Sequence, residues 1–262
     1  MRLDVFLSGN GLVRSRERGK QLIREGKVTV DGKICTKPSA EISGGEKVKV
    51  TEDNGYVGRG LIKLETAFEA FGLDVRDKVC ADIGASTGGF TQCLLNHGAK
   101  KVYAVDVGHG QLDDRLLIDS RVRNMEGVNA RYLHPDSFEE RPDLISVDVS
   151  FISLRLLMPA LCSCLNEGGE MAVLIKPQFE AGKAALNKNG IVKDPKDHVR
   201  VLKELTECFT ACGLSVCGAV PSSIKGGDGN IEYIAWLKRP EQAAKIAVKA
   251  DPAGLVRKAF LL

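Results

Sequence analysis

Two charged side chains at the ends of expected strands have the chemistry for proton transfer. Asp148 ends the stretch 143–148 and Lys176 ends the stretch 170–176, and each is followed by residues that stop a strand. Either residue alone would more often be an ordinary surface charge. Ligands of an open α/β sheet collect at the carboxyl ends of its strands, so we expect both side chains to face one crevice.

A glycine-rich stretch suggests what else occupies that crevice. Residues 82–91 read Asp-Ile-Gly-Ala-Ser-Thr-Gly-Gly-Phe-Thr and follow the short apolar run 78–81. The pattern predicts a strand, a tight turn and a helix. Such a turn brings backbone N–H groups and a helix N-terminus up to a ligand, which favours a nucleotide-like cofactor. The alternative is a glycine turn with a purely structural role.

The residues within this stretch favour one cofactor over another. A dinucleotide motif needs a glycine where this chain has Ser86, so a pyrophosphate cradle is disfavoured. An acidic residue at the strand end, Asp82, suits a cationic ligand with a free amine, such as S-adenosylmethionine. Asp106 ends a second strand, 101–106, where a carboxylate can accept hydrogen bonds from a ribose diol. The predicted cofactor site comprises Asp82, Gly84, Ala85, Ser86, Thr87, Gly88, Gly89, Phe90, Asp106 and Asp148.

S-adenosylmethionine donates methyl groups, and the motifs that the chain lacks exclude two kinds of methyl acceptor. No Asp/Asn-Pro-Pro-aromatic motif for exocyclic amines follows the strand that ends at Asp148, and no cysteine follows a proline. A hydroxyl acceptor remains, and it needs a base. Lys176 is the candidate base, and Lys63 could favour loss of its proton by charge repulsion. Asp148 and Glu232 would orient the lysines and the hydroxyl. No metal is needed, because the leaving group is neutral.

The charge of the chain is unevenly distributed. The net charge is +3, yet residues 1–50 hold 11 Lys and Arg against 6 Asp and Glu. The remainder of the chain is therefore slightly acidic. A compact basic segment joined to a near-neutral domain is expected when the segment binds an anionic polymer and the domain catalyses a reaction. A solubilising surface is the plainer interpretation of such a charge run.

Other compositional features exclude several classes of protein. The chain has 262 residues, of which 44% are hydrophobic, enough for one large and one small domain. Its eight cysteines include no C-x-x-C pair, so we expect reduced core residues and no metal site. No apolar run is long enough for a membrane helix, and the N-terminus lacks a signal-peptide pattern. A cytoplasmic protein without a membrane partner is expected.

The N-terminal segment is expected to form a small unit of helices and strands. The pattern predicts helices at 3–8 and 16–25, a hairpin around Asp31-Gly32 and a strand at 46–50. Its motifs are Arg2-Leu-Asp-x-x-Leu, Gly11-Leu-Val-x-Ser-Arg, Gln21-Leu-Ile-x-x-Gly-x-Val-x-Val-Asp-Gly and Lys37-Pro-Ser. In these motifs the segment resembles an S4 domain, a small RNA-binding module, which implies recognition of RNA shape and phosphates. The candidate RNA-binding residues are Arg2, Arg14, Arg16, Arg18, Lys20, Arg24 and Arg59.

Beyond residue 59, strands alternate with helices, which predicts an α/β fold with a mostly parallel, doubly wound sheet. Further helices are expected at 59–71, 153–165 and 197–212, and further strands at 215–220 and 231–237. Together with the expected S-adenosylmethionine site, this pattern predicts the fold class of a Rossmann-like methyltransferase, preceded by the small α+β domain that resembles S4. The predicted domains are 1–51 (S4-like), a linker at 52–59, the catalytic domain at 60–240 and a weakly helical tail at 241–262.

Nearly all of residues 1–240 resemble the TlyA family, whose members are known as ribosomal RNA 2′-O-methyltransferases and, historically, as haemolysins. Lys63, Asp148, Lys176 and Glu232 match the Lys-Asp-Lys-Glu constellation of FtsJ-like 2′-O-ribose methyltransferases. The resemblance implies S-adenosylmethionine as cofactor and ribosomal RNA or ribosomal subunits as partner. It extends over Tyr56-Val-Gly-Arg-Gly-Leu-Ile-Lys-Leu-Glu, the glycine-rich stretch, Asp106-Val-Gly-His-Gly-Gln-Leu, Val147-Asp-Val-Ser-Phe-Ile-Ser-Leu, Ile175-Lys-Pro-Gln-Phe-Glu and Gly229-Asn-Ile-Glu-Tyr.

Two other functions compete with the enzyme. A haemolysin-like, membrane-active protein needs a long apolar or strongly amphipathic segment, and none is evident outside the expected core. A non-catalytic RNA-binding factor would keep the cofactor fold as a scaffold. Binding of S-adenosylmethionine discriminates it from the enzyme.

Overall fold

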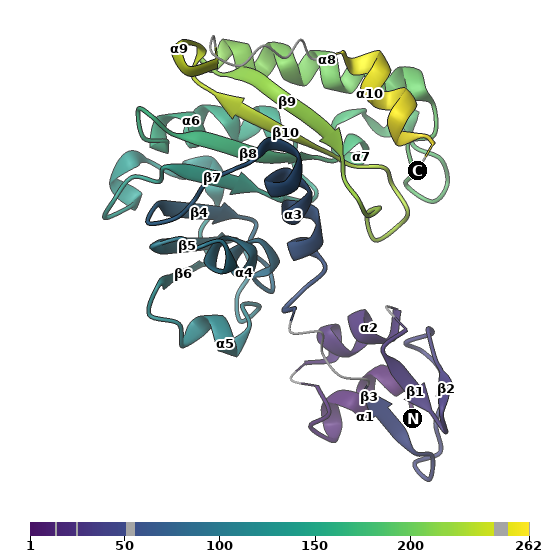
Figure 1. Ribbon diagram of the computed structural model, residues 1–262. Helices are drawn as coiled ribbons and strands as arrows, with labels where there is room; N and C mark the ends of the chain where they lie inside the picture. The colour runs from purple at the N-terminus through teal and green to yellow at the C-terminus, as the bar shows by residue number, and fades with distance from the viewer. Residues whose placement is uncertain (14, 25, 51–55, 244–250, 262) are drawn as a thin grey trace. The chain divides into compact units, whose positions relative to one another are not determined.

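The structure is a computed structural model that describes residues 1–13, 15–24, 26–50, 56–243 and 251–261 (Figure 1). The chain divides into two units, Met1–Gly55 and Tyr56–Leu262. Arg14, half of the predicted linker (52–55) and part of the predicted tail lie outside the described residues.

The N-terminal unit packs two helices, α1 (Leu3–Gly9) and α2 (Arg16–Arg24), with a three-stranded antiparallel sheet. The strands, in the order β2-β1-β3, are β1 (Val28–Val30), β2 (Lys33–Ile34) and β3 (Val48–Val50). Asp31 and Gly32 form the predicted tight turn between β1 and β2, with φ of +50° and +79°. The apolar core of this unit contains Leu3, Leu7, Val13, Leu22, Ile23, Val28 and Ile42.

The C-terminal unit is built on a seven-stranded sheet in the order β6-β5-β4-β7-β8-β10-β9. Its strands are β4 (Val79–Ile83), β5 (Lys101–Asp106), β6 (Val122–Glu126), β7 (Leu144–Val147), β8 (Glu170–Ile175), β9 (Ser215–Pro221) and β10 (Tyr233–Lys238). Strands β6, β5, β4, β7 and β8 pair in parallel, and β10 runs antiparallel to both of its neighbours. The predicted doubly wound, mostly parallel fold is confirmed.

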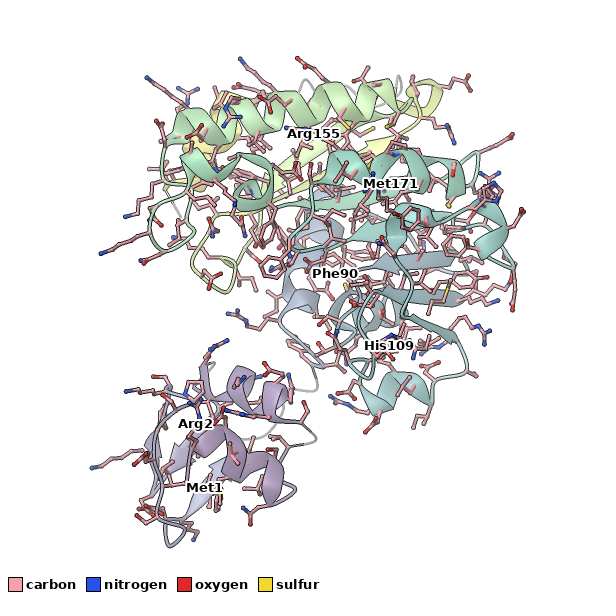
Figure 2. All side chains as sticks on the ribbon, turned by 180° about the vertical axis from the view of Figure 1, so that it is seen from behind. Met1, Arg2, Phe90, His109, Arg155 and Met171 are labelled. Atoms are coloured by element: carbon pink, nitrogen blue, oxygen red, sulfur yellow. The ribbon has the colours of Figure 1, made fainter. Side chains whose placement is uncertain are left out.

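Helices lie on both faces of this sheet (Figure 1). Strand β4 shows the division: Ala81 and Ile83 join one apolar cluster with residues of α6, α8 and α10, whereas Cys80 joins a second cluster with residues of α3 and α4. The side chains of Phe90 and Met171 are buried in this unit (Figure 2). The helices are α3 (Gly60–Phe71), α4 (Gly89–Asn96), α5 (Asp114–Leu117), α6 (Met158–Cys164), α7 (Pro177–Glu180), α8 (Pro195–Ala211), α9 (Pro240–Ala243) and α10 (Pro252–Ala259).

Several elements differ from the sequence prediction. Strand β6 was not predicted, because it is an edge strand whose residues are exposed or only partly buried and include no apolar run. The expected helix 153–165 is divided into a 3-10 turn and α6, which carries a proline in its first turn. The 3-10 turns are η1 (Ala130–Tyr132), η2 (Pro135–Ser137), η3 (Leu154–Leu156) and η4 (Lys183–Ala185). No helix in the described segments is long and apolar enough to cross a membrane.

The predicted tail contains a well-formed helix, α10. The carboxylate of Asp251 caps this helix by accepting a hydrogen bond from the Ala253 backbone N–H. Val256 and Ala259 of α10 are buried in the same apolar cluster as residues of α8. Helix α10 therefore packs with α8 on one face of the sheet.

Candidate active site

Two ion pairs join the four charged residues singled out in the sequence. Lys176 Nζ lies 2.5 Å from Asp148 Oδ1, and Lys63 Nζ lies 2.6 Å from Glu232 Oε2. Lys176 and Glu232 are buried, and the other two side chains are largely buried. The structure thus arranges the residues as two lysine–carboxylate pairs.

The topology of the sheet explains this convergence. Strands β7 and β8 are parallel neighbours, so Asp148 and Lys176, which directly follow them, leave the sheet at the same edge. Strand β10 is antiparallel to β8 and pairs Tyr233 with Ile175, so Glu232, directly before β10, lies at that edge too. Helix α3 then supplies Lys63.

Two polar side chains that the sequence analysis missed complete these pairs. The Lys176 Nζ group donates a hydrogen bond to Ser150 Oγ at 2.9 Å. Gln178 Nε2 donates to Glu232 Oε1 at 3.4 Å. Ser150 lies two residues after Asp148 in the segment that ends the strand, and this spacing was the available signal for it.

A cavity of about 470 Å³ lies beside the Lys176 pair, which is within the usual size range of ligand pockets. Its lining includes four of the predicted cofactor residues: Gly84, Ser86, Asp106 and Asp148. Asp106 also fixes the surrounding loops, since its carboxylate accepts hydrogen bonds from the backbone N–H groups of Ser86 (2.8 Å) and Gly108 (2.7 Å). The apolar part of the lining includes Val105, Val107, Val128, Ile152 and Leu157.

The glycines of the motif have a packing role that the sequence did not reveal. A Cβ atom on Gly84 would lie 2.3 Å from the Asp148 carbonyl oxygen, and one on Gly88 would lie 2.1 Å from Leu116 Cδ1. Both glycines also have positive φ, +86° and +93°. Of the predicted cofactor residues, Asp82, Ala85, Thr87, Gly88, Gly89 and Phe90 are not among those that line the cavity.

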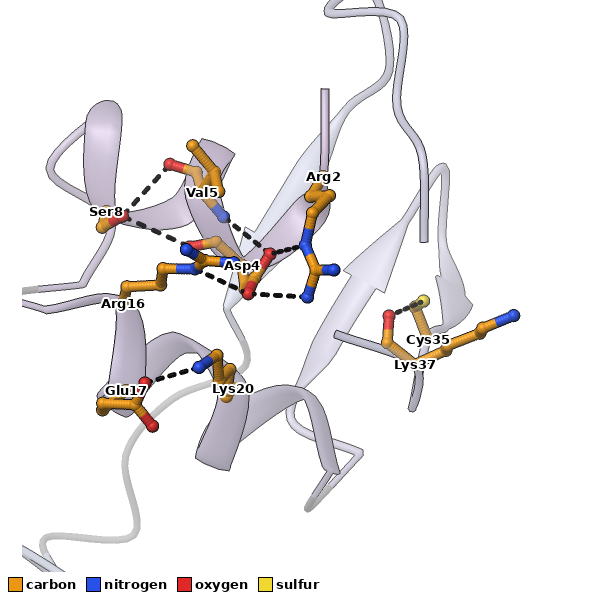
Figure 3. A network of polar contacts seen from close by, with 9 residues as sticks. All are labelled: Arg2, Asp4, Val5, Ser8, Arg16, Glu17, Lys20, Cys35 and Lys37. Atoms are coloured by element: carbon orange, nitrogen blue, oxygen red, sulfur yellow. Dashed lines mark hydrogen bonds and ion pairs between the residues drawn. The ribbon is translucent and has the colours of Figure 1, made fainter. Parts of the chain in front are cut away.

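In the N-terminal unit, two of the predicted RNA-binding residues meet a buried carboxylate (Figure 3). Asp4 is fully buried and accepts hydrogen bonds from Arg2 Nε at 2.9 Å and from Arg16 Nε at 2.9 Å. Each arginine side chain remains nearly half exposed. The hydrogen bond from Arg2, reinforced by Arg16, holds the pKa of Asp4 well below its usual range. Asp4 therefore orients two guanidinium groups at the surface of this unit.

The other predicted RNA-binding residues have different surroundings. Lys20 pairs with Glu17 on the surface of α2 at 2.5 Å, Arg18 is partly buried on the same helix, and Arg24 is exposed at its end. Arg59 belongs to the C-terminal unit, directly before α3. Arg14 lies outside the described residues.

Family models match both units. Residues 1–48 match the model of the S4 domain. Residues 56–239, which contain the two ion pairs and the cavity, match the model of the FtsJ-like methyltransferase. The chain belongs to the FtsJ-like methyltransferase family.

Relatives of this FtsJ-like methyltransferase span most of its length, and they confirm the resemblance to the TlyA family. "Putative rRNA methyltransferase YqxC" of Bacillus subtilis is 45% identical, over 91% of this chain and 86% of the relative. "16S/23S rRNA (cytidine-2'-O)-methyltransferase TlyA" of Mycobacterium tuberculosis is 41% identical, over 96% and 95%. A solved structure named "Putative hemolysin from Streptococcus thermophilus" is 42% identical, with a TM-score of 0.79 over 100% of this chain and 96% of that one.

Asp82, the acidic residue of the glycine-rich motif, is fully buried in this FtsJ-like methyltransferase. Its Oδ2 atom accepts hydrogen bonds from the backbone N–H (2.8 Å) and the hydroxyl (2.7 Å) of Thr91, while Oδ1 has no hydrogen-bond partner among the described residues. Burial raises the pKa of Asp82 to about 7, against the opposing effect of the Thr91 hydrogen bonds. An unpartnered buried carboxylate oxygen favours a cation nearby.

An exposed aromatic residue that the sequence analysis missed stands at the mouth of the FtsJ-like site. Phe151 is 91% exposed, lines the cavity and has a φ of +64°, which is unusual for a bulky residue. Its ring centroid lies 5.1 Å from that of Phe179, which follows Lys176 by three residues. Strained, exposed residues of this kind concentrate at ligand sites.

Proposed function

We propose that this FtsJ-like methyltransferase transfers the methyl group of S-adenosylmethionine to the 2′-hydroxyl of a ribose in ribosomal RNA. The observation that carries the proposal is the buried amine of Lys176, held between a carboxylate and a hydroxyl beside a ligand-sized cavity. The basic N-terminal unit matches the S4 domain, and this match supports an RNA substrate. The name of the Mycobacterium tuberculosis relative supports ribosomal RNA and the 2′-hydroxyl. Because ribosomal RNA would be the substrate, we propose that the protein is located in the cytoplasm.

Residues around the cavity fit S-adenosylmethionine. Asp106, in the lining, offers carboxylate oxygens to a ribose diol. Asp82 is buried next to the lining residue Ile83, and its unpartnered oxygen favours a cationic amine nearby. The aliphatic lining suits the adenine ring. When bound, S-adenosylmethionine supplies an electrophilic methyl group on a sulfonium. The glycines of the motif hold the loop close to the strand that ends at Asp148.

The surroundings of Lys176 define where its amine accepts a proton. A neutral amine has two N–H groups and one lone pair. Nζ donates one hydrogen bond to Ser150 Oγ at 2.9 Å and forms an ion pair with Asp148 Oδ1 at 2.5 Å, so the protein contacts the amine on two sides. The lone pair is left for the 2′-hydroxyl of the substrate. The Lys63–Glu232 pair, at the start of the adjacent strand β10, positions the ribose.

The test is methyl transfer from tritiated S-adenosylmethionine to ribosomal subunits and to protein-free ribosomal RNA, followed by nucleoside analysis. The proposal expects label in a 2′-O-methylated nucleoside. Label in a base would overturn the choice of acceptor. RNA binding without any transfer, together with no calorimetric binding of S-adenosylmethionine, would favour a non-catalytic RNA-binding factor.

Affinity for the cofactor should depend on pH through Asp82. In the cofactor-free protein, the raised pKa of about 7 keeps this carboxyl largely protonated below neutral pH. A cationic ligand favours the ionised form, so affinity should weaken by up to about tenfold per unit as the pH falls below roughly 7. Calorimetry of S-adenosylmethionine from about pH 5.5 to about pH 7.5, on both sides of that pKa, measures the slope. Asp82→Asn should flatten it, and an unchanged slope in that variant would refute the assignment.

Phe151 should contribute to binding of the target nucleotide by stacking on its base. Base–aromatic stacking is worth about 1–3 kcal/mol, so Phe151→Ala should lower kcat/KM for RNA by roughly 5- to 150-fold at saturating S-adenosylmethionine. Phe151→Trp keeps an aromatic face and should retain most of the activity. Equal losses in both variants would indicate that backbone geometry, not stacking, is what matters at this position.

A further inference from the structure

A second group of ligand-type side chains lies between α3 and α4, outside the proposed active site. It consists of Glu65 on α3, Cys93 on α4 and His97 at the end of α4, and their donor atoms all lie within 4.8 Å of one another. Cys93 Sγ is 3.5 Å from Glu65 Oε1, and His97 Nε2 is 2.8 Å from Glu65 Oε2.

The two helices hold these side chains firmly. Cys93 and His97 are four residues apart, so they share one face of α4, the spacing used by paired ligands on metal-binding helices. Glycine at position 89 lets α3 approach α4 closely, since a Cβ there would lie 2.9 Å from the Leu61 nitrogen. The His97 ring is stacked on Phe68 with centroids 3.7 Å apart, which fixes its plane.

The donor set matches a borderline-soft divalent cation. Zinc binds thiolate sulfur at about 2.3 Å and imidazole nitrogen or carboxylate oxygen at about 2.0–2.2 Å, so tetrahedral ligands lie roughly 3.3–3.6 Å apart. The 3.5 Å from Cys93 Sγ to Glu65 Oε1 already fits. His97 Nε2 lies 2.8 Å from the other carboxylate oxygen, Oε2, so the carboxylate must turn to present one oxygen to an ion that both other ligands bind. Thiolate and carboxylate together neutralise a 2+ ion, which suits a partly buried site.

We propose that Glu65, Cys93 and His97 form a binding site for Zn²⁺ that joins α3 to α4. Cys93 is fully buried, whereas the side chains of Glu65 and His97 are 31% and 35% exposed, so the ion enters from their side and water fills the fourth position. On binding, the Cys93 S–H bond is broken and its proton passes to solvent. His97 Nε2 also loses the proton that it donates to Glu65, and the neutral ring then carries its proton on Nδ1. Metal–sulfur, metal–oxygen and metal–nitrogen bonds replace the two hydrogen bonds of Glu65.

The helices that carry the proposed ligands also carry residues of the candidate active site and of the cofactor motif's hydrogen-bond network. Two residues before Glu65, α3 carries Lys63, the partner of Glu232. Two residues before Cys93, α4 carries Thr91, the partner of Asp82. A bound ion would therefore fix the helix that carries Lys63 and the helix that follows the cofactor motif. The proposal does not depend on the RNA substrate.

Titration of the chelator-treated full-length protein with Co²⁺ tests the site. We expect one equivalent to produce a thiolate-to-cobalt absorption band in the near ultraviolet, and Zn²⁺ to abolish it. Cys93→Ser should remove the band, and His97→Asn and Glu65→Gln should weaken cobalt binding by roughly tenfold or more, since even outer-shell changes cost that much. Zn²⁺ should raise the melting temperature of the wild-type protein more than that of the variants.

A second cysteine group supplies the matched control. Cys162 and Cys212 interact with each other near Cys208, so they could also bind cobalt. Cys212→Ser should leave the band unchanged. Absence of the band in the wild-type protein, its persistence in Cys93→Ser, or its loss in Cys212→Ser would each overturn the proposal. If Cys93→Ser does not fold, the partly exposed His97→Asn decides, with an unchanged cobalt affinity counting against the site.

Discussion

Lys176→Met should lower the rate of methyl transfer by about 10²–10⁴-fold, the usual contribution of a positioned general base. Methionine keeps much of the length and volume of the lysine side chain but has no amine to accept a proton from the ribose hydroxyl, to pair with Asp148 or to donate to Ser150. Binding of S-adenosylmethionine should persist, because Lys176 is not among the residues that line the cavity. Single-turnover transfer at saturating RNA and cofactor measures the chemical step directly.

Lys176→Arg is the matched control. Arginine keeps a cation beside Asp148 but stays protonated, so it cannot act as a base. An arginine variant as slow as the methionine variant would support proton abstraction. Substantial activity in Lys176→Arg would mean that the positive charge is what matters, and wild-type activity in Lys176→Met would remove Lys176 from the mechanism.

Asp4→Asn should weaken RNA binding by about 10- to 100-fold at moderate salt, the size expected for losing two phosphate contacts. Asp4 accepts hydrogen bonds from Arg2, Arg16 and the Val5 backbone N–H through both carboxylate oxygens. An asparagine NH₂ group would face at least two of these donors, whichever way the amide is turned. The two guanidinium groups would lose their fixed orientation. RNA affinity measured as a function of salt, below the unfolding temperature of the variant, provides the readout.

Glu17→Gln is a control with the same change of charge. Glu17 is an 80% exposed partner of Lys20, and exposed ion pairs contribute little. Both substitutions add one positive charge to the N-terminal unit, so an effect of net charge alone would tighten RNA binding in both variants. Weaker binding in Asp4→Asn only would support an orienting role for the buried carboxylate. Tighter binding in both would contradict it.

The fold and the charged residues of the site were predictable for specific reasons. Apolar runs bounded by turn residues predicted the strands of the sheet. Asp148 and Lys176 were predicted to lie together because they follow neighbouring parallel strands, which end at the same edge of the sheet. Lys63 and Glu232, 169 positions apart, were both expected at the site, but their ion pair was not: Lys63 was expected to act on Lys176 by charge repulsion. That pairing depends on the antiparallel direction of β10, which periodicity does not reveal.

Other parts of the site could not be predicted, because they depend on tertiary contacts. Ser150 and Phe151 are ordinary residue types, and their positions follow from the way the chain turns after β7. The close approach of Gly84 to the Asp148 carbonyl is equally invisible in the motif. Cys93 and Glu65 are 28 positions apart, so cysteine spacing alone predicted no metal site.

The antiparallel strand β10 has a consequence for how the enzyme matures during synthesis. Because β10 inserts between β8 and β9, both flanking strands leave the ribosome before the strand that must separate them. The nascent sheet therefore keeps an open slot until residue 238 has been translated, and Glu232 arrives only with the strand that fills it. A chain that stops short of β10 therefore lacks Glu232 and its ion pair with Lys63.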